Sequence, residues 1–130
     1  MTELPPPGCW PTIACDDALS FIDFLVTLGF ERTAVYETDG FVEHAQLDWP
    51  EGGGVMLGSH KPDSVWPIRP GTAGIYVVTD DPDAVRERAL TTKAEVSEIT
   101  EQDYGSRDVR IKDPEGNLWS FGTYRGEPRT

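Results

Sequence analysis

Histidine and cysteine, the residues most often used for proton transfer near neutral pH and for zinc binding, are few in this chain. His44 and His60 are its only histidines, and Cys9 and Cys15 are its only cysteines. Because an imidazole exchanges its proton near neutral pH, His44 is the candidate catalytic base; a half-buried strand histidine with a structural hydrogen bond is the alternative. The two cysteines lie on one expected strand and indicate neither a disulfide framework nor a zinc site, which fits a reducing cytoplasm.

His44 belongs to a stretch, residues 41–49, in which polar and apolar side chains alternate as in a half-buried strand. Extended to the other expected strands, this alternation predicts a face that packs against helices, made of Ala45, Leu47, Val55, Leu57, Val109, Ile111, Trp119 and Phe121. The opposite face should line a concave groove made of Trp10, Thr12, His44, Gln46, Met56, Tyr76, Asp108, Arg110 and Ser120. Aromatic surface with a few hydrogen-bonding groups is typical of a small-molecule pocket.

Some of the site assignments have alternatives. Trp66 and Tyr104 lie in expected loops, where they would either form aromatic walls of the pocket or simply pack. Asp108 and Arg110 would either contact a ligand or form a cross-strand ion-pair cluster. The ligand-binding prediction includes all four residues.

The elements that must position these residues occur twice. Asp16-Asp17 recurs as Asp80-Asp81, and Pro50-Glu51-Gly52 recurs as Pro114-Glu115-Gly116, with the same spacing between the two copies in both cases. A unit that occurs only twice is too short an array for a solenoid. The repeat therefore predicts a duplicated module whose two copies pack on each other, with the site in the groove between them.

Each copy is predicted to have the order βαβββ. In the first copy Asp16 or Asp17 caps a helix that Gly29 ends, and in the second Asp81 caps a helix that starts with Pro82 and carries Val85, Ala89 and Leu90 inward. The expected strands are 10–15, 31–36, 41–49 and 54–58, then 74–79, 95–100, 106–112 and 118–123. The prediction is a single α+β domain, residues 1–130, with module 1 at 9–60, a linker at 61–71 and module 2 at 72–125.

Paired βαβββ units, with the runs Asp103–Arg107 and Asp113–Gly122, resemble the vicinal oxygen chelate superfamily. The likeness is to its glyoxalase/bleomycin resistance protein/dioxygenase family, in the PhnB-like or bleomycin-resistance-like branch. In the metalloenzymes of that superfamily, His or Glu on the first and last strand of each module hold one divalent ion. The resemblance places those positions at Trp10, Met56 (Leu57 if the register slips by one), Gly74 and Ser120.

None of these four side chains is a good ligand for a hard divalent ion. The resemblance therefore implies a family member with no metal and no cofactor, although the many carboxylates leave a relocated carboxylate cage as an alternative.

Charge and hydropathy exclude two further classes of protein. A net charge of −12 argues against nucleic acid, and no apolar run approaches the roughly 18 residues of a membrane helix. The acidity serves either solubility or the attraction of a cationic ligand.

The preferred hypothesis is a metal-independent small-molecule binding protein, similar to bleomycin resistance proteins and with an antibiotic-resistance role. The alternative is an enzyme, a glyoxalase-like lyase or isomerase or a dioxygenase, with an unorthodox or missing metal site. The third hypothesis is a structural or regulatory partner that has no formed groove. In the resembling families a second chain completes the cup, and the aromatics Trp10, Trp66 and Tyr124 are expected to be exposed, so we expect a homodimer.

Overall fold

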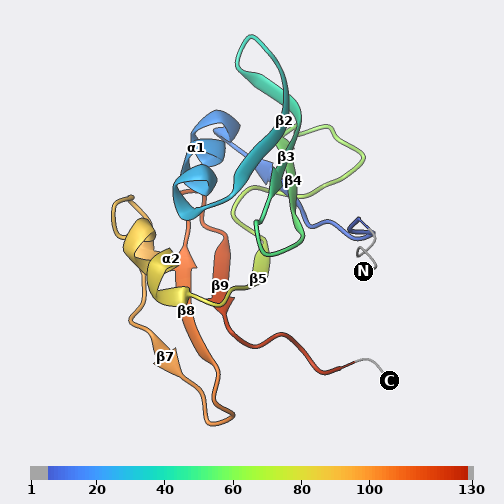
Figure 1. Cartoon of the computed structure of the whole chain (residues 1–130). Helices are drawn as coiled ribbons and strands as arrows, with labels where there is room; N and C mark the ends of the chain where they lie inside the picture. The colour runs from blue at the N-terminus through green and yellow to red at the C-terminus, as the bar shows by residue number, and fades with distance from the viewer. Residues whose placement is uncertain (1–5, 129–130) are drawn as a thin grey trace.

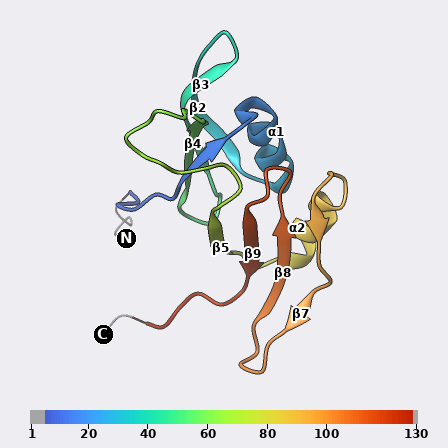
Figure 2. The same ribbon diagram turned by 180° about the vertical axis from the view of Figure 1, so that it is seen from behind.

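The computed structural model describes residues 6–128 and contains two mixed sheets, with both helices on the same side of the molecule (Figures 1 and 2). The first half consists of β1 (Thr12–Cys15), α1 (Ala18–Leu28), β2 (Glu31–Thr38), β3 (Phe41–Asp48) and β4 (Gly54–Ser59). The second consists of β5 (Gly74–Val78), α2 (Pro82–Ala89), β6 (Glu95–Val96), β7 (Thr100–Glu101), β8 (Arg107–Lys112) and β9 (Leu118–Gly122). The strand orders are β1-β4-β3-β2 and β5-β9-β8-β6, with β7 also paired to β8. The predicted α+β fold of two βαβββ modules is confirmed.

The helices begin where the sequence indicates. The Asp17 carboxylate accepts a hydrogen bond from the Ser20 amide at 3.2 Å. Gly29 ends α1 with a φ of 122° that favours glycine. In α2 the Asp81 carboxylate accepts from the Ala84 amide at 3.0 Å. The expectation that Leu90 points inward is wrong: Leu90 follows the last helical residue, and half of it is exposed.

The expected strand at 95–100 is interrupted, and this is the main departure from the predicted order. β6 and β7 are separated at residues 97–99. The carbonyl of Ser97 accepts a hydrogen bond from Arg86 Nε of α2 at 2.9 Å, and the Ser97 hydroxyl accepts from the Arg110 amide at 2.9 Å. Because a side chain replaces a backbone group in the ladder, the edge of this sheet cannot remain regular.

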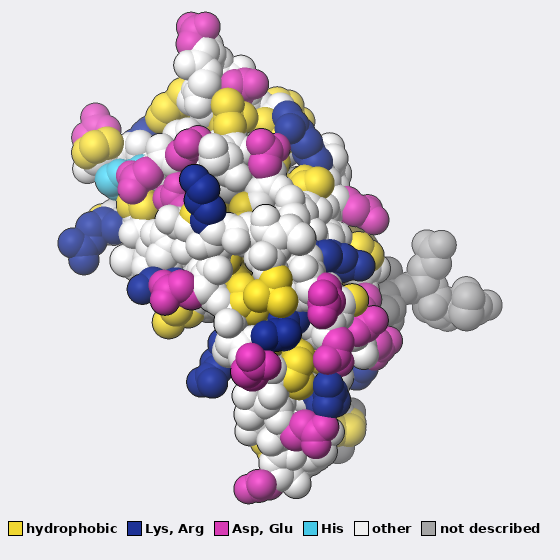
Figure 3. Space-filling model, turned by 90° about the vertical axis from the view of Figure 1, so that its left-hand side faces the viewer, with side chains coloured by type: hydrophobic (Ala, Val, Ile, Leu, Met, Phe, Trp, Pro, Cys, Tyr) yellow, Lys and Arg dark blue, Asp and Glu magenta, His cyan; other side chains and the backbone are white. Residues whose placement is uncertain are grey.

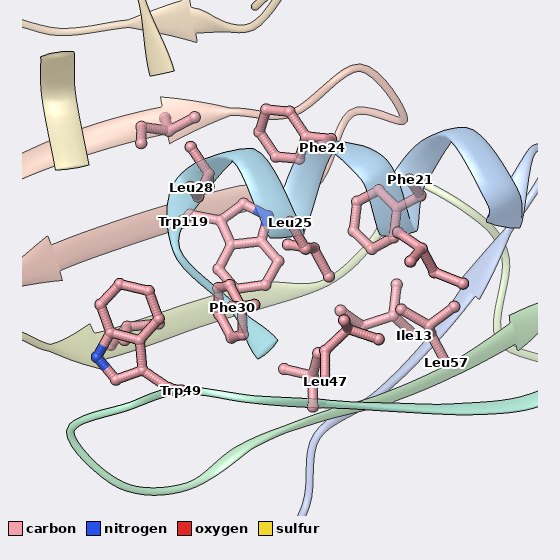
Figure 4. Packing of buried hydrophobic residues seen from close by; sticks show 14 of the residues in the cluster. Ile13, Phe21, Phe24, Leu25, Leu28, Phe30, Leu47, Trp49, Leu57 and Trp119 are labelled. Carbon is pink, nitrogen blue, oxygen red and sulfur yellow. The ribbon is translucent and has the colours of Figure 1, made fainter. Parts of the chain in front are cut away.

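One continuous core joins the two modules. All eight residues assigned to the helix-packed face are buried, as predicted. Figure 4 shows Phe30, just after α1, among aromatic side chains of both modules. The Phe30 ring centroid lies 4.8 Å from that of Trp49, 5.7 Å from that of Trp119 and 6.5 Å from that of Phe121. Trp49 also donates from Nε1 to the Val78 carbonyl at 2.9 Å, which satisfies its indole N–H across the module boundary.

The repeated Pro-Glu-Gly turns clamp each module to the start of the other module's helix. The Glu115 carboxylate accepts hydrogen bonds from the Asp16 and Asp17 amides at 2.7 and 2.8 Å. The Glu51 carboxylate accepts one from the Asp80 amide at 2.8 Å. Glu51 and Glu115 are repeat equivalents, as are Asp16 and Asp80, so these crossed clamps account for the most obvious residues of the repeat.

The second of these turns is built on Asp113, which is buried. Its carboxylate accepts hydrogen bonds from the amides of Glu115 and Asn117, from the Asn117 side chain and from Trp119 Nε1, all at 2.8–2.9 Å. A buried charge is tolerated when its lone pairs are filled in this way. The network holds Glu115 in place for the clamp.

The segments before β1 and after β9 leave the molecule on the side away from the helices (Figures 1 and 2). On the helix side, Figure 3 shows acidic side chains spread among Lys and Arg without forming one patch. Within residues 6–128, no helix has the length and apolar character needed to span a membrane.

Candidate ligand-binding site

The strand register builds two matching rows on the sheet faces turned away from the helices, called the open faces here. In module 1, Met56 lies between Thr12 and Gln46. In module 2, Ser120 lies between Tyr76 and Arg110. By the spacing of the repeat, Ser120 is the equivalent of Met56, Tyr76 of Thr12, and Arg110 of Gln46. Side chains at paired positions of neighbouring strands point to the same face. The six residues therefore lie where alternation predicts them.

The open face of module 1 borders a hollow of about 260 Å³ beneath the linker. Thr12 and His44 line it from the sheet, and Trp66 lines it from the linker. Phe41 and His60 also line this hollow, and sequence reasoning did not select either one. Following β4 two residues past Gly58 would have identified His60. Its backbone N–H donates a hydrogen bond to the carbonyl of Cys15, the last residue of β1, at 2.8 Å.

The candidate base His44 is half-buried on this open face. Its ring stacks on Tyr36 with the centroids 6.1 Å apart and the planes 20° from parallel. Tyr36 lies opposite His44 in the β2–β3 register. The imidazole is thus held by a neighbouring strand and borders the hollow, a position from which it could contact a ligand.

A polar network and a tryptophan cover the rest of this face. Gln46 donates from Nε2 to the Asp48 carboxylate at 3.1 Å, and the Thr33 hydroxyl donates to the same group. A Cβ atom at Gly54 would come within 2.9 Å of the Trp10 ring and would overlap the Leu47 carbonyl oxygen. Gly54 is therefore required for Trp10 to pack directly on the start of β4.

The open face of module 2 borders a larger hollow of about 690 Å³. Tyr76, Arg110 and Ser120 line it together with Leu118 and other neighbours. The Tyr76 hydroxyl donates to the Tyr124 carbonyl at 2.7 Å, and partial burial raises the pKa of Tyr76 above its ordinary value. The phenol therefore stays protonated through the neutral range and keeps its donor.

Asp108 lies on the same open face and is tied to its own module. Its carboxylate accepts a hydrogen bond from Gln102 Nε2 at 2.9 Å. Within residues 6–128, Asp108 and Arg110 form no ion pair with each other, so the cross-strand cluster considered from sequence is not present. Arg110 is exposed, and it lies on the surface of the hollow.

The two open faces do not combine into one groove within a chain, which corrects the expectation of a site between the two modules of one chain. The hollow of module 1 and that of module 2 have no lining residue in common. The modules instead meet through their apolar faces and the crossed clamps, as Phe30 and Trp49 show. Of the other predicted site residues, Trp10, Gln46, Met56, Tyr104 and Asp108 line neither of these two hollows.

The four positions that the resemblance assigned to a metal do not suit one. Met56 and Ser120 lie on the open faces, and Gly74 offers no side chain. Leu57 is 2% exposed, so a register slipped by one residue would bring in only a core leucine. Across residues 6–128, no three His, Cys, Asp or Glu side chains are grouped so that they could hold a metal ion.

Residues 10–121 match the sequence model of the Glyoxalase/Bleomycin resistance protein/Dioxygenase superfamily. An uncharacterized protein of Mycobacterium bovis is 34% identical over 126 residues, covering 89% of this chain and 82% of that protein. TioX from Micromonospora sp. ML1 has a TM-score of 0.71 at 26% identity, covering 88% of this chain and 98% of TioX.

A more distant solved structure carries a ligand. The bleomycin-binding protein of the bleomycin-producing Streptomyces verticillus was solved with copper(II)-bleomycin. It has a TM-score of 0.63 at 20% identity, covering 98% of this chain and all of that protein. At this identity the likeness shows a shared fold and nothing more.

Proposed function

Because the chain belongs to the Glyoxalase/Bleomycin resistance protein/Dioxygenase superfamily, we propose that it is a metal-independent binding protein for a small molecule. The observation that carries the proposal is the pair of matching rows on the open faces. At the four positions where the resemblance places the superfamily's metal ligands, this chain has an indole, a thioether, a glycine and a hydroxyl group. The rows add further hydroxyl, amide, phenol and guanidinium groups around Met56 and Ser120. Such groups bind a ligand by apolar contact and hydrogen bonds and do not bind a hard cation.

A bleomycin-type antibiotic is the first ligand to test. Two solved relatives of the fold are bleomycin-binding proteins, one of them described as complexed with bleomycin and the other with its copper(II) form. The net charge of −12 favours a cationic ligand over an anionic one. Both cysteines are free, and we place the protein in the reducing cytoplasm, where such an antibiotic would be sequestered.

We further propose that a second copy of the chain completes the binding site. Each hollow is open, and large apolar side chains beside it remain exposed: Trp66 is 64% exposed, Leu118 61% and Tyr76 46%. In a two-fold symmetric homodimer, the open face of module 1 would lie opposite the open face of the partner's module 2. Such a dimer has two equivalent cups, each made from both chains.

The charges of the two modules support this pairing. Residues 9–60 contain nine Asp and Glu but a single Arg, whereas residues 72–125 contain eleven acidic and seven basic residues. On the open faces, Asp48 lies opposite Glu31 in module 1, while Arg110 and Lys112 lie on module 2. Both modules are net negative by these counts, −8 for module 1 and −4 for module 2, so pairing module 1 with module 2 is less repulsive than pairing two copies of module 1. Arg110 also offers a cation to the acidic Asp48–Glu31 pair.

Tryptophan fluorescence tests ligand binding directly. Trp66 is exposed in the linker, Trp10 is half-buried on the open face rather than exposed as expected, and Trp49 and Trp119 are buried. Titration with bleomycin should quench the emission at micromolar ligand, and Trp66→Phe should remove part of that change while Trp49→Phe, the core control, leaves it. A ligand present at 100 times its Kd should also stabilise the fold by about 2.7 kcal/mol. Unchanged emission together with an unchanged melting temperature would rule out bleomycin-type ligands.

The dimer is tested separately by light scattering. We expect twice the 14.4 kDa mass of one chain, with an interface of roughly 1,600 Å² or more. Arg110→Glu should weaken the dimer, and salt at about 1 M should weaken the wild-type dimer because exposed charges are screened. The exposed helix residue Arg88 faces the other module of its own chain, so Arg88→Ala serves as a control that leaves the mass unchanged. The mass of a single chain at micromolar concentration would exclude the shared cup.

The position of His44 supports a second candidate, an enzyme of the glyoxalase or dioxygenase type. His44 borders a hollow together with Thr12 and Trp66. Metal analysis of protein purified without chelator separates the two functions. Stoichiometric Ni, Zn, Mn or Fe would favour the enzyme and overturn the assignment of Trp10, Met56, Gly74 and Ser120 as non-ligands.

A further inference from the structure

A third hollow, of about 500 Å³, lies at the far end of module 2, and its lining is unusually simple. Tyr104, Tyr124 and Glu127 line it. The two phenol rings have centroids 5.6 Å apart, and their planes meet at 69°. Tyr104 lies in the turn between β7 and β8, and Tyr124 follows β9. Two aromatic rings from distant parts of the chain therefore meet in one corner with a carboxylate beside them.

The corner is held in place although its side chains are exposed. The Tyr124 carbonyl accepts from the Tyr76 hydroxyl at 2.7 Å, and the next residue, Arg125, forms an ion pair with Asp80. On the other side, the Gly105 amide donates to the Gln102 carbonyl at 2.9 Å, and its φ of 89° suits glycine. These contacts fix both backbones, so the rings need little ordering when a ligand arrives.

Glu127 is fixed by the same cluster. Its carboxylate accepts from the Tyr124 hydroxyl at 3.0 Å, and this hydrogen bond raises the pKa of Tyr124 above its ordinary value. The phenol therefore remains a neutral ring rather than a phenolate. Arg125, the basic residue next to Tyr124, is already paired with Asp80, which leaves the charge of Glu127 available to a ligand.

The chemistry of the corner points to an organic cation. The faces of phenol rings carry negative potential, and they attract ammonium groups whose charge is spread over methyl or methylene groups. A single carboxylate supplies too few oxygen ligands for a divalent metal ion, which needs about six. We propose that the Tyr104–Tyr124–Glu127 corner is a binding subsite for a quaternary or alkylated ammonium group.

This subsite does not depend on the function proposed above. All three lining residues belong to module 2 or to the segment that follows it, and no second copy is needed to form the corner. A chain that is a monomer, or that ignores bleomycin, would still have it.

The experiment compares choline with 3,3-dimethylbutan-1-ol, which has the same shape without the charge. The tyrosine ring signals of the full chain are followed by NMR at constant ionic strength, and Tyr36 on the other module serves as an internal reference. We expect choline to bind with a Kd on the order of 1–10 mM and to shift the signals of Tyr104 and Tyr124 but not of Tyr36, whereas the alcohol leaves all three unchanged.

Variants distinguish binding at the ring faces from non-specific electrostatic attraction of the cation to the acidic protein. Tyr104→Phe keeps the ring and should bind choline within about twofold of wild type, whereas Tyr104→Leu should bind at least roughly threefold more weakly. Glu127→Gln should also weaken binding, and Tyr36→Leu should not. These side chains are exposed, so each variant should melt near the wild-type temperature. Equal shifts with the neutral alcohol, no choline-dependent shift, or unchanged binding by Tyr104→Leu would each overturn the proposal.

Discussion

The crossed clamps offer a quantitative test of how the modules are joined. Glu115→Ala removes a carboxylate that accepts two backbone hydrogen bonds, at 2.7 and 2.8 Å, from the residues that start α1. Hydrogen bonds to charged groups contribute about 1.5–3 kcal/mol each when shielded from water. Because the two amides are exposed, water would replace part of that energy. We therefore expect a loss of about 2 kcal/mol in the free energy of unfolding.

The repeat supplies an internal comparison. Glu51→Ala removes the equivalent carboxylate, which accepts a single bond from the Asp80 amide at 2.8 Å. We expect Glu51→Ala to lower the free energy of unfolding by about 1 kcal/mol, half the loss expected for Glu115→Ala. For a domain of this size, each kcal/mol lowers the melting temperature by roughly 3–5 °C, so the shifts should be about 6–10 °C for Glu115→Ala and about 3–5 °C for Glu51→Ala.

Urea unfolding and calorimetry at one fixed protein concentration provide the measurement, since dimerisation would make stability depend on concentration. Glu87→Ala is the control: Glu87 is an exposed glutamate on α2, and its removal should change stability by no more than about 0.5 kcal/mol. If Glu115→Ala behaves like Glu87→Ala, or costs less than Glu51→Ala, the carboxylates do not clamp the modules and this reasoning fails.

Three further predictions concern single positions. Gly122→Ala should cost about 1–3 kcal/mol by urea unfolding, because its Cβ would lie 2.8 Å from the Tyr76 hydroxyl; stability equal to wild type would mean that Tyr76 moves freely. Asp113→Ala should lower the free energy of unfolding by about 3–5 kcal/mol in the same assay, because it leaves several buried donors without an acceptor. A loss below about 1 kcal/mol would show that water reaches those donors. A thiol reagent should modify one cysteine per native chain, Cys9, and two after unfolding, because burial raises the pKa of Cys15; rapid modification of both native thiols would contradict this.

Local patterns in the sequence were enough to assign the apolar side of each strand. Alternation assigned Leu47, Val109 and Phe121 to the helix-packed face, and all three are buried. The sequence also determined the helix starts at Asp17 and Asp81, because a capping side chain bonds an amide only three residues away. These features depend on residues close together in the chain, whose relative positions are fixed by helix or strand geometry.

The way in which the surfaces combine became visible only in the folded chain. The open faces border two separate hollows, because the modules meet through aromatic side chains such as Phe30 and Trp49 and not through the polar rows. The Tyr104–Tyr124 corner likewise joins a turn to the segment after β9. Nothing in local spacing fixes such contacts, because the packing of the whole chain sets the distance between residues far apart in sequence. The repeat showed that Glu51 and Glu115 are equivalent, and only the folded chain showed that each reaches the other module.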